Sequence, residues 1–255
     1  MEFLVVENLR LEPPAEGRKT KPEPLVDGLS FVLEKRRSLS LVCEDRRALL
    51  ALALAVVKAG PVAAGSITFA GIPIKNFSEA RFRPVRRRLQ AVFPDALGQL
   101  SPGRTVREAF REVLDIWARR EGKEERGRRV EASMIACGLP EAIQDLYPAE
   151  LDAVERQCVA LARAMLTGPE LLVCCGLTEG LDDVQVAELL PRVRHLREEY
   201  DLTLLALTDD LAVAALLGET VGVIHRGQLV ESGPAGELVR RPSHDYTRRL
   251  VAAAL

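Results

Sequence analysis

Residues 38–70 alternate between short apolar strands and an apolar helix. SLSLVC at 38–43 is typical of a buried strand, and a polar turn leads from it into ALLALALAVVKA at 48–59, which is predicted to be a helix. GSITFA at 65–70 is predicted to be a second strand. A strand, a turn, a helix and a strand in this order predict an α/β core.

The flanking segments are predicted to add a β layer and a helical region. Residues 2–11 and 29–33 are expected to form a small N-terminal antiparallel layer. Residues 105–145 have helical periodicity and many Arg and Glu side chains, with a polar hinge expected at 121–127. The alternation then resumes with a strand at 171–175, a helix at 183–200, a strand at 202–208, a helix at 210–217, a hairpin at 220–233 and a helical tail at 235–254.

Composition excludes several classes of protein. A chain of 255 residues with 47% hydrophobic residues can bury the core of one domain, or of one domain with a helical insert. The formal net charge of −2 gives no bulk attraction to nucleic acid. No apolar run reaches the roughly 18 residues that a membrane span needs, and Leu49–Val57 is expected to be a buried helix. The first residues lack a secretion signal, so a cytoplasmic protein is expected.

The cysteines favour buried, reduced thiols. There are five, and no C-x-x-C pair occurs. Cys43, Cys174 and Cys175 lie at the ends of predicted strands, where they could form a site for a soft metal. Packing in a hydrophobic core is the favoured interpretation, and no metal site is predicted.

The stretch from Tyr147 to Asp182 carries a resemblance to a known family. YPAELDAVERQCVALARAMLTGPELLVCCGLTEGLD parallels Y-P-x-E-L-S-G-G-Q-x-Q-R-V-x-x-A-R-A followed by L-L-x-x-D-E-P-T-S-x-L-D. These are the signature helix and Walker B strand of ABC-transporter ATPases, and the chain resembles that family over its whole length. The matching residues are Tyr147, Pro148, Glu150, Leu151, Gln157, Val159, Ala162, Arg163, Ala164, Pro169, Leu171, Leu172, Thr178, Leu181 and Asp182.

Other segments resemble the dipeptide, oligopeptide and nickel importer branch of that family. They are Val92-Phe93-x-Asp95, Leu100-Ser101-Pro102, Thr105-Val106-Arg107-Glu108 and the ending at 243–248, SHDYTR. Within that branch, the segment TVREAFRE at 105–112 resembles the nickel importers more than the peptide importers. The resemblance implies a P-loop NTPase-like α/β core with an N-terminal antiparallel β layer and a helical subdomain. It predicts a single domain over 1–255, with its core at 1–95 and 165–255 and the helical subdomain at about 100–164.

In this chain, the residues that contact phosphate and Mg²⁺ in the family's phosphate-binding loop are replaced. The loop needs glycines so that backbone N–H groups close around phosphates, a Lys for the β/γ oxygens and a hydroxyl for Mg²⁺. Leu49 replaces the Lys and Leu50 the hydroxyl, and the eight positions are Cys43, Glu44, Asp45, Arg46, Arg47, Ala48, Leu49 and Leu50. The two acids are expected at the helix N-terminus in place of phosphate. Alternatively, the two arginines recruit phosphate, or all four charges are solvated.

The other ATP-contacting positions are replaced as well. Walker B's Asp-Glu pair is Cys175-Gly176, the Q-loop glutamine is Pro94, and the switch histidine is Asp209. None of these can bind Mg²⁺ and polarise water as the originals do. The signature S-G-G-Q is replaced as well, whereas the D-loop keeps Asp182. The residues in the signature positions are Asp152, Ala153, Val154 and Glu155.

These losses predict a catalytically degenerate subunit. In the family each ATP lies between the Walker loops of one subunit and the signature of the other, and this chain has lost both halves. The expected role is a structural or regulatory partner in an importer-type complex for peptides or nickel, with another ABC ATPase subunit and a membrane permease pair, peripheral to the inner face of the membrane. ATP and Mg²⁺ are implied only by the resemblance, and no cofactor is expected. The alternatives are a divergent active ATPase, a free-standing ABC-like regulatory or assembly module, and a sequence stripped of its motifs.

Overall fold

A computed structural model describes residues 1–14, 23–94 and 99–254, and Asp95 of the importer-branch pattern lies outside them. The chain divides into two compact units. Unit 1 comprises Met1–Arg83, Val173–Gly176 and Thr203–Leu255, and unit 2 comprises Pro84–Leu172 and Leu177–Leu202. The predicted division into a core and a helical subdomain stays a prediction. None of the helices in the described ranges is both long and apolar enough to cross a bilayer.

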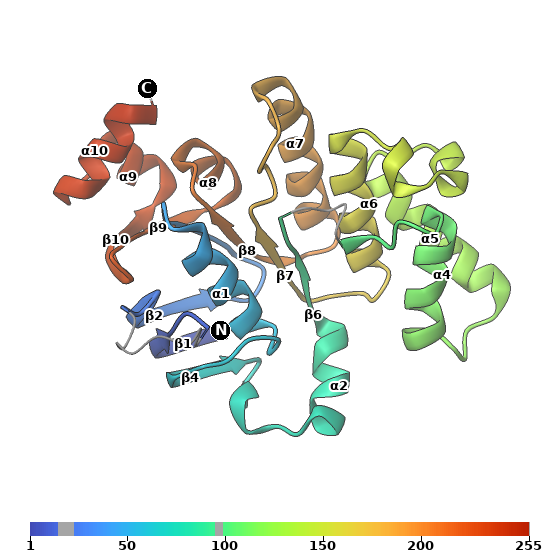
Figure 1. Cartoon of the computed structure of the whole chain (residues 1–255), viewed down its shortest axis with the longest axis horizontal. Helices are drawn as coiled ribbons and strands as arrows, with labels where there is room; N and C mark the ends of the chain where they lie inside the picture. The colour runs from blue at the N-terminus through green and yellow to red at the C-terminus, as the bar shows by residue number, and fades with distance from the viewer. Residues whose placement is uncertain (15–22, 95–98, 255) are drawn as a thin grey trace. The chain divides into compact units, whose positions relative to one another are not determined.

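The N-terminal β layer of unit 1 is antiparallel, as predicted, but it has four strands, because the strand predicted at 65–70 as part of the α/β core pairs with β1 in this layer. Its order is β2-β1-β4-β5, and Figure 1 shows β1, β2 and β4 side by side. β2 begins three residues before the predicted strand, and its side chains alternate between buried and exposed along much of its length, because one face of the sheet packs on the core. The strands are β1 (Glu2–Leu11), β2 (Val26–Glu34), β4 (Ala64–Phe69) and β5 (Ile72–Pro73).

The second sheet has six strands in the order β10-β9-β3-β8-β7-β6. β3 pairs in parallel with both β8 and β9, and β9 and β10 form the predicted antiparallel hairpin. Every residue of β3, β7 and β8 is buried, which explains why these strands are continuous apolar runs. The strands are β3 (Ser38–Val42), β6 (Leu89–Val92), β7 (Leu171–Cys175), β8 (Thr203–Thr208), β9 (Thr220–His225) and β10 (Gln228–Pro234).

The helices of unit 1 depart from the predictions in two places. α1 occupies Arg46–Val56, so it begins two residues before the predicted 48–59 and ends three residues earlier. The tail, predicted as one helix, is two: α9 (Ala235–Arg240) and α10 (Asp245–Ala254). The break contains Pro242, which cannot donate a backbone hydrogen bond within a helix. α8 (Leu211–Leu217) lies as predicted.

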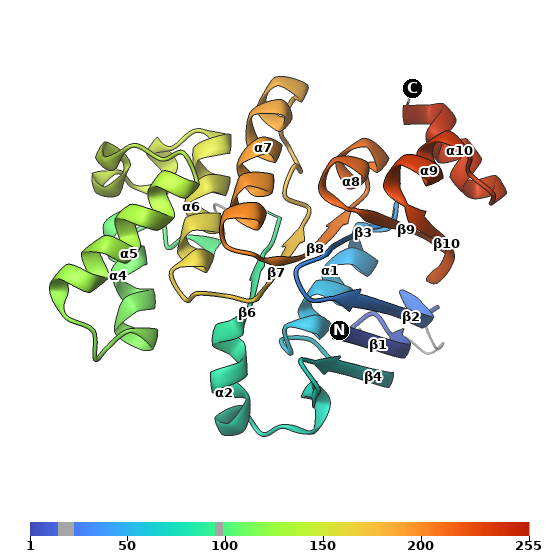
Figure 2. The same cartoon turned by 180° about the vertical axis from the view of Figure 1, so that it is seen from behind.

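Unit 2 is mostly helical. α4 begins at Thr105, which forms a capping box with Glu108. The break between α4 and α5 covers residues 118–122 and not the predicted 121–127, because α5 already begins at Lys123. α4 and α5 each pack against α6, as Figure 2 shows. The helices are α4 (Val106–Trp117), α5 (Lys123–Ala136), α6 (Ala153–Met165) and α7 (Asp183–Glu199), with 3-10 turns η2 (Glu141–Asp145) and η3 (Pro148–Glu150).

α2 and β6 are among the elements that were not predicted from the sequence. α2 (Glu79–Arg88) contains a proline and five arginines, which obscure its two buried apolar residues, Phe82 and Val85, and it runs across the division between the units. β6 directly follows it and has only four residues. A 3-10 turn, η1 (Ile74–Asn76), precedes α2. Short or strongly charged elements give little periodic signal, so tertiary packing decides them.

Candidate functional site

The loop between β3 and α1 has only three residues outside regular structure. Val42 ends β3, and α1 begins at Arg46 with Asp45 as its N-cap. The Asp45 carboxylate accepts hydrogen bonds from the Arg47 backbone N–H at 2.9 Å and from the Arg47 guanidinium at 3.0 and 2.9 Å. These contacts lower the pKa of Asp45, and the hydrogen bond from the Arg47 side chain has the largest effect. Asp45 therefore occupies the helix N-terminus as predicted.

The first backbone N–H groups of α1 are bonded within the protein. The N–H groups of Ala48 and Leu49 donate to the Asp45 carbonyl oxygen at 2.9 and 3.3 Å. The Arg47 N–H is taken by the Asp45 carboxylate. A phosphate cradle depends on such N–H groups pointing at the ligand. In this chain the protein's own oxygens satisfy them.

The two leucines that replace the lysine and the hydroxyl have different environments. The Leu49 side chain is only 3% exposed and belongs to the hydrophobic core, whereas Leu50 is 39% exposed. Neither supplies a polar atom to a phosphate or to Mg²⁺. Position 49 therefore contributes packing where the family has a charge.

Glu44 was expected at the helix N-terminus beside Asp45, but its carboxylate accepts a hydrogen bond from a distant segment instead. Its Oε2 accepts a hydrogen bond of 2.6 Å from the hydroxyl of Tyr246, on α10. Burial, followed by the contact with Glu44, raises the pKa of Tyr246. The carboxylate is thus directed toward the C-terminal helix, because a tyrosine hydroxyl donates to it there.

The alternative in which Arg46 recruits phosphate meets a competing contact within the protein. Arg46 Nε donates to Asp209 Oδ2 at 2.7 Å, and these two side chains are 58% and 36% exposed. Asp209 stands in the switch-histidine position, directly after β8. The next residue, Asp210, caps α8 by accepting from the N–H groups of Ala212 and Val213. Both acids after β8 are used by the protein itself.

The Walker B positions lie at the end of β7. Cys174 and Cys175 are each 1% exposed, and the Gly176 N–H donates to the Leu207 carbonyl at 2.8 Å. Burial raises the pKa of Cys174 to about 12 and also raises that of Cys43, so both thiols stay protonated at neutral pH. Among the residues that the structure describes, no three His, Cys, Asp or Glu side chains are grouped as metal ligands.

The signature positions are in unit 2, where they begin α6. Asp152 is the N-cap and forms a capping box: its carboxylate accepts from the Glu155 N–H at 2.7 Å, and Glu155 accepts from the Asp152 N–H at 2.8 Å. Ala153 is the first helical residue, and Val154 is buried. The helix N-terminus that the family offers to a γ-phosphate is therefore satisfied within this chain.

Two further positions of the pattern are also structural. Asp182 of the D-loop caps α7 in a reciprocal box with Gln185. Pro94 is partly buried directly after Phe93 and has no side-chain donor or acceptor. Gln99, which the sequence reasoning missed, donates to the Phe93 carbonyl at 2.6 Å and accepts from its N–H at 3.2 Å. A glutamine six residues from its partner has no recognisable sequence signal.

A large concave site is found in each of the two units. In unit 1, a cavity of about 790 Å³ is lined by the β3–α1 loop, by the β9–β10 turn and by Tyr246. In unit 2, a groove of about 1010 Å³ lies between α4 and α5, with an apolar floor and charged edges. The floor residues are Phe110, Leu114, Val130, Met134, Ile135 and Leu139.

Curated relatives match most of this chain. It is 34% identical over 229 residues to the peptidoglycan transport ATP-binding protein YejF of Agrobacterium fabrum, covering 90% of this chain but 42% of that protein. It is 33% identical to a putative peptide import ATP-binding protein of Brucella abortus, covering 89% of this chain and 68% of the relative. It is 31% identical to the oligopeptide transport protein AppF of Bacillus subtilis, covering 92% and 72%. The chain thus spans less than half of the first relative. No protein-family model matches the chain.

Solved structures share the fold. A dimeric bacterial ABC-transporter cassette superimposes with a TM-score of 0.80 at 18% identity, over 91% of this chain and 98% of the cassette. A component of the cbiONQ ABC-transporter complex of Clostridium perfringens has a TM-score of 0.79 at 19% identity, over the full length of both chains. The fold therefore agrees with the relatives, and the chain belongs to the family of ABC-transporter ATP-binding proteins.

Proposed function

We propose that this chain is a catalytically degenerate subunit of an ABC importer for peptides, in which it acts as a structural or regulatory partner. The observation that carries the proposal is the start of α1: the N–H groups of Arg47, Ala48 and Leu49 bond to Asp45, and the Leu49 side chain is buried where the family has a lysine. The peptide cargo is suggested by the names of the relatives from Brucella abortus and Bacillus subtilis. The nickel cargo has no support among those relatives.

The rate loss expected from the replaced residues supports the absence of ATP hydrolysis. Removing one group that stabilises developing charge costs on the order of 10²–10³ in rate. The lysine, the Mg²⁺ ligand, the catalytic glutamate and the switch histidine are all replaced, at positions 49, 175, 176 and 209. If the residues fitted the nucleotide, the loop after Val42 would hold its phosphates. Instead the acids Glu44, Asp45 and Asp209 lie there, and the two neighbouring arginines are ion-paired with Asp45 and Asp209.

Mg-ATP is therefore expected to bind no more tightly than about 1 mM. Isothermal titration of the full chain with Mg-ATP measures this directly. AppF of Bacillus subtilis, titrated in parallel, is the positive control. Stoichiometric binding at micromolar concentration, with phosphate release, would support the divergent active ATPase instead.

The groove between α4 and α5 is the proposed contact with a membrane permease subunit. Its apolar floor continues to Ile135, whose side chain is 69% exposed. Basic and acidic residues lie at its edges, among them Arg111, Lys123 and Glu131. An apolar centre with a charged rim is the usual composition of a protein interface. Docking there would hold the chain at the cytoplasmic face of the membrane, beside a second ATPase subunit.

Ile135→Glu is expected to reduce recovery of permease subunits at least tenfold, because it places a charge in the apolar floor of the groove. The measurement is co-purification of the tagged full chain from its native membranes, with mass spectrometry of the recovered subunits. Val184→Glu is the matched control, because Val184 is 76% exposed on α7, outside the groove. If the unmodified chain recovers no permease or ATPase subunit, the free-standing regulatory module replaces this proposal.

A further inference from the structure

The C-terminal segment of unit 1, residues 242–254, is attached to the fold at two separate places. One is the hairpin strand β10, and the other is the β3–α1 loop. At the second place, the Tyr246 hydroxyl donates to Glu44 over 2.6 Å. An O–H···O⁻ bond of this length is among the stronger hydrogen bonds in proteins. It joins two residues that are 202 positions apart in the chain.

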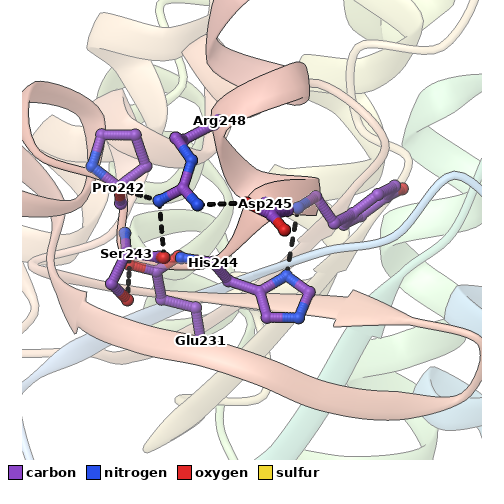
Figure 3. A network of polar contacts seen from close by, with 7 residues as sticks. Glu231, Pro242, Ser243, His244, Asp245 and Arg248 are labelled. Carbon is purple, nitrogen blue, oxygen red and sulfur yellow. Dashed lines mark hydrogen bonds and ion pairs between the residues drawn. The ribbon is translucent and has the colours of Figure 1, made fainter.

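The first attachment is centred on the carboxylate of Glu231. It accepts from the Ser243 N–H and hydroxyl, both at 2.7 Å, and from the His244 N–H at 3.0 Å. Figure 3 shows Ser243 and His244 converging on this side chain. Burial raises the pKa of Glu231, but hydrogen bonds from hydroxyl and N–H groups in residues 243–247 outweigh it and lower the pKa to about 2. The carboxylate is therefore a charged acceptor throughout the neutral range.

The first turn of α10 is closed by its own contacts. His244 Nδ1 accepts from the Tyr246 N–H at 3.1 Å. Arg248 donates to the Ser243 carbonyl at 2.7 Å and forms an ion pair with Asp245, as Figure 3 shows. These bonds link the residues before the helix to its first turn. A chain of hydrogen bonds therefore links Glu231 to the first turn of α10, which carries Tyr246.

Tyr246 is packed into the core of unit 1. Its ring stacks on His225 with centroids 3.8 Å apart and an interplanar angle of 27°, and the residue is 6% exposed. It belongs to a buried cluster that includes Val42, the last residue of β3 before the loop. The other buried members are Leu211, Ala214, Val221, Val223, Ala235 and Leu238.

We propose that residues 242–254 form a strap that holds the β3–α1 loop in a single conformation, with Glu231 as its anchor and the Tyr246–Glu44 hydrogen bond as its pin. The strap is a conformational device: it couples the C-terminal helix to the position where related folds bind phosphate. It extends the proposed function without depending on it, because the loop can be held in this way whether or not the chain retains affinity for a nucleotide.

Hydrogen exchange of the full chain tests the strap. Tyr246→Phe keeps the ring and removes only the pin, so the Arg47, Ala48 and Leu49 amides are expected to exchange roughly tenfold faster, the effect of losing one charge-assisted hydrogen bond. Glu231→Gln is expected to accelerate the same amides, because the anchor weakens. Tyr200→Phe is the matched control: Tyr200 is partly exposed at the end of α7, and its substitution is expected to leave the loop unchanged.

Glu44, the exposed residue that accepts the hydrogen bond from Tyr246, provides an independent variant. Glu44→Ala is expected to accelerate exchange in the loop to the same extent as Tyr246→Phe, and the double variant is expected to be no faster than either single one, since both remove one bond. Unchanged loop exchange in Glu44→Ala or in a folded Tyr246→Phe variant overturns the proposal. So does an additive double variant, or equal acceleration in Tyr200→Phe.

Discussion

Leu49→Lys is expected to lower the free energy of unfolding by about 3 kcal/mol or more, and not to restore phosphate binding. The family resemblance alone suggests the opposite, since lysine is the residue that this position has lost. Leu49, however, is 3% exposed on α1, and its N–H already bonds to the Asp45 carbonyl. A lysine there must either bury its ammonium group without a partner or displace the helix from the core.

Leu50→Lys is the matched control for this substitution. The two leucines are neighbours on α1, but Leu50 is 39% exposed, so its replacement is expected to change stability by less than about 0.5 kcal/mol. Urea unfolding followed by circular dichroism compares the two, and titration with Mg-ATP measures binding. If Leu49→Lys is as stable as the unmodified chain and binds Mg-ATP, then the loop has kept its capacity for phosphate.

Cys175→Asp, which restores the Walker B carboxylate, is also expected to destabilise the protein by about 3 kcal/mol at neutral pH. Cys175 is 1% exposed at the end of a strand whose five residues are all buried. In the described residues no metal-ligand cluster is present to receive the new carboxylate. Burial raises the folded-state pKa of such a carboxyl group, so stability is expected to recover as the pH falls below that pKa toward the ordinary pKa of aspartate in the unfolded chain.

Cys175→Ser separates the effect of charge from that of polarity. It is nearly isosteric with cysteine and cannot ionise, so a loss of about 1 kcal/mol without pH dependence is expected. Thermal unfolding of both variants between pH 5 and pH 8 gives the comparison. An aspartate variant that is as stable as the serine variant at pH 8 would show that the end of β7 still accommodates a charge.

Several features of the site were predictable from the sequence, because short-range chemistry controls them. Asp45 lies three residues before the predicted apolar helix, where an acid can cap the helix, and Asp152 is followed three residues later by Glu155, the spacing of a capping box. The continuous apolar runs at 38–42 and 171–175 predicted buried strands for the same reason.

Other features depended on contacts between distant segments. The partner of Glu44 is a tyrosine 202 residues away, and the partner of Arg46 is an aspartate 163 residues away. Sequence reasoning placed Glu44 with Asp45 at the helix N-terminus, because both are acids in the same turn. A single carboxylate sufficed as the cap, and the other was free to accept a hydrogen bond from α10.

The sequence by itself determined the α/β architecture, an acid at the N-terminus of α1, and the absence of lysine, Mg²⁺ ligand and catalytic acid from the positions that carry them in the family. These follow from periodicity and from residue chemistry over a few neighbours. Only the tertiary structure decided that α1 begins as early as Arg46, that Leu49 is core, and that the C-terminal helix meets the loop. Burial and long-range hydrogen bonds arise when the strands bring remote segments together, and local sequence does not contain that information.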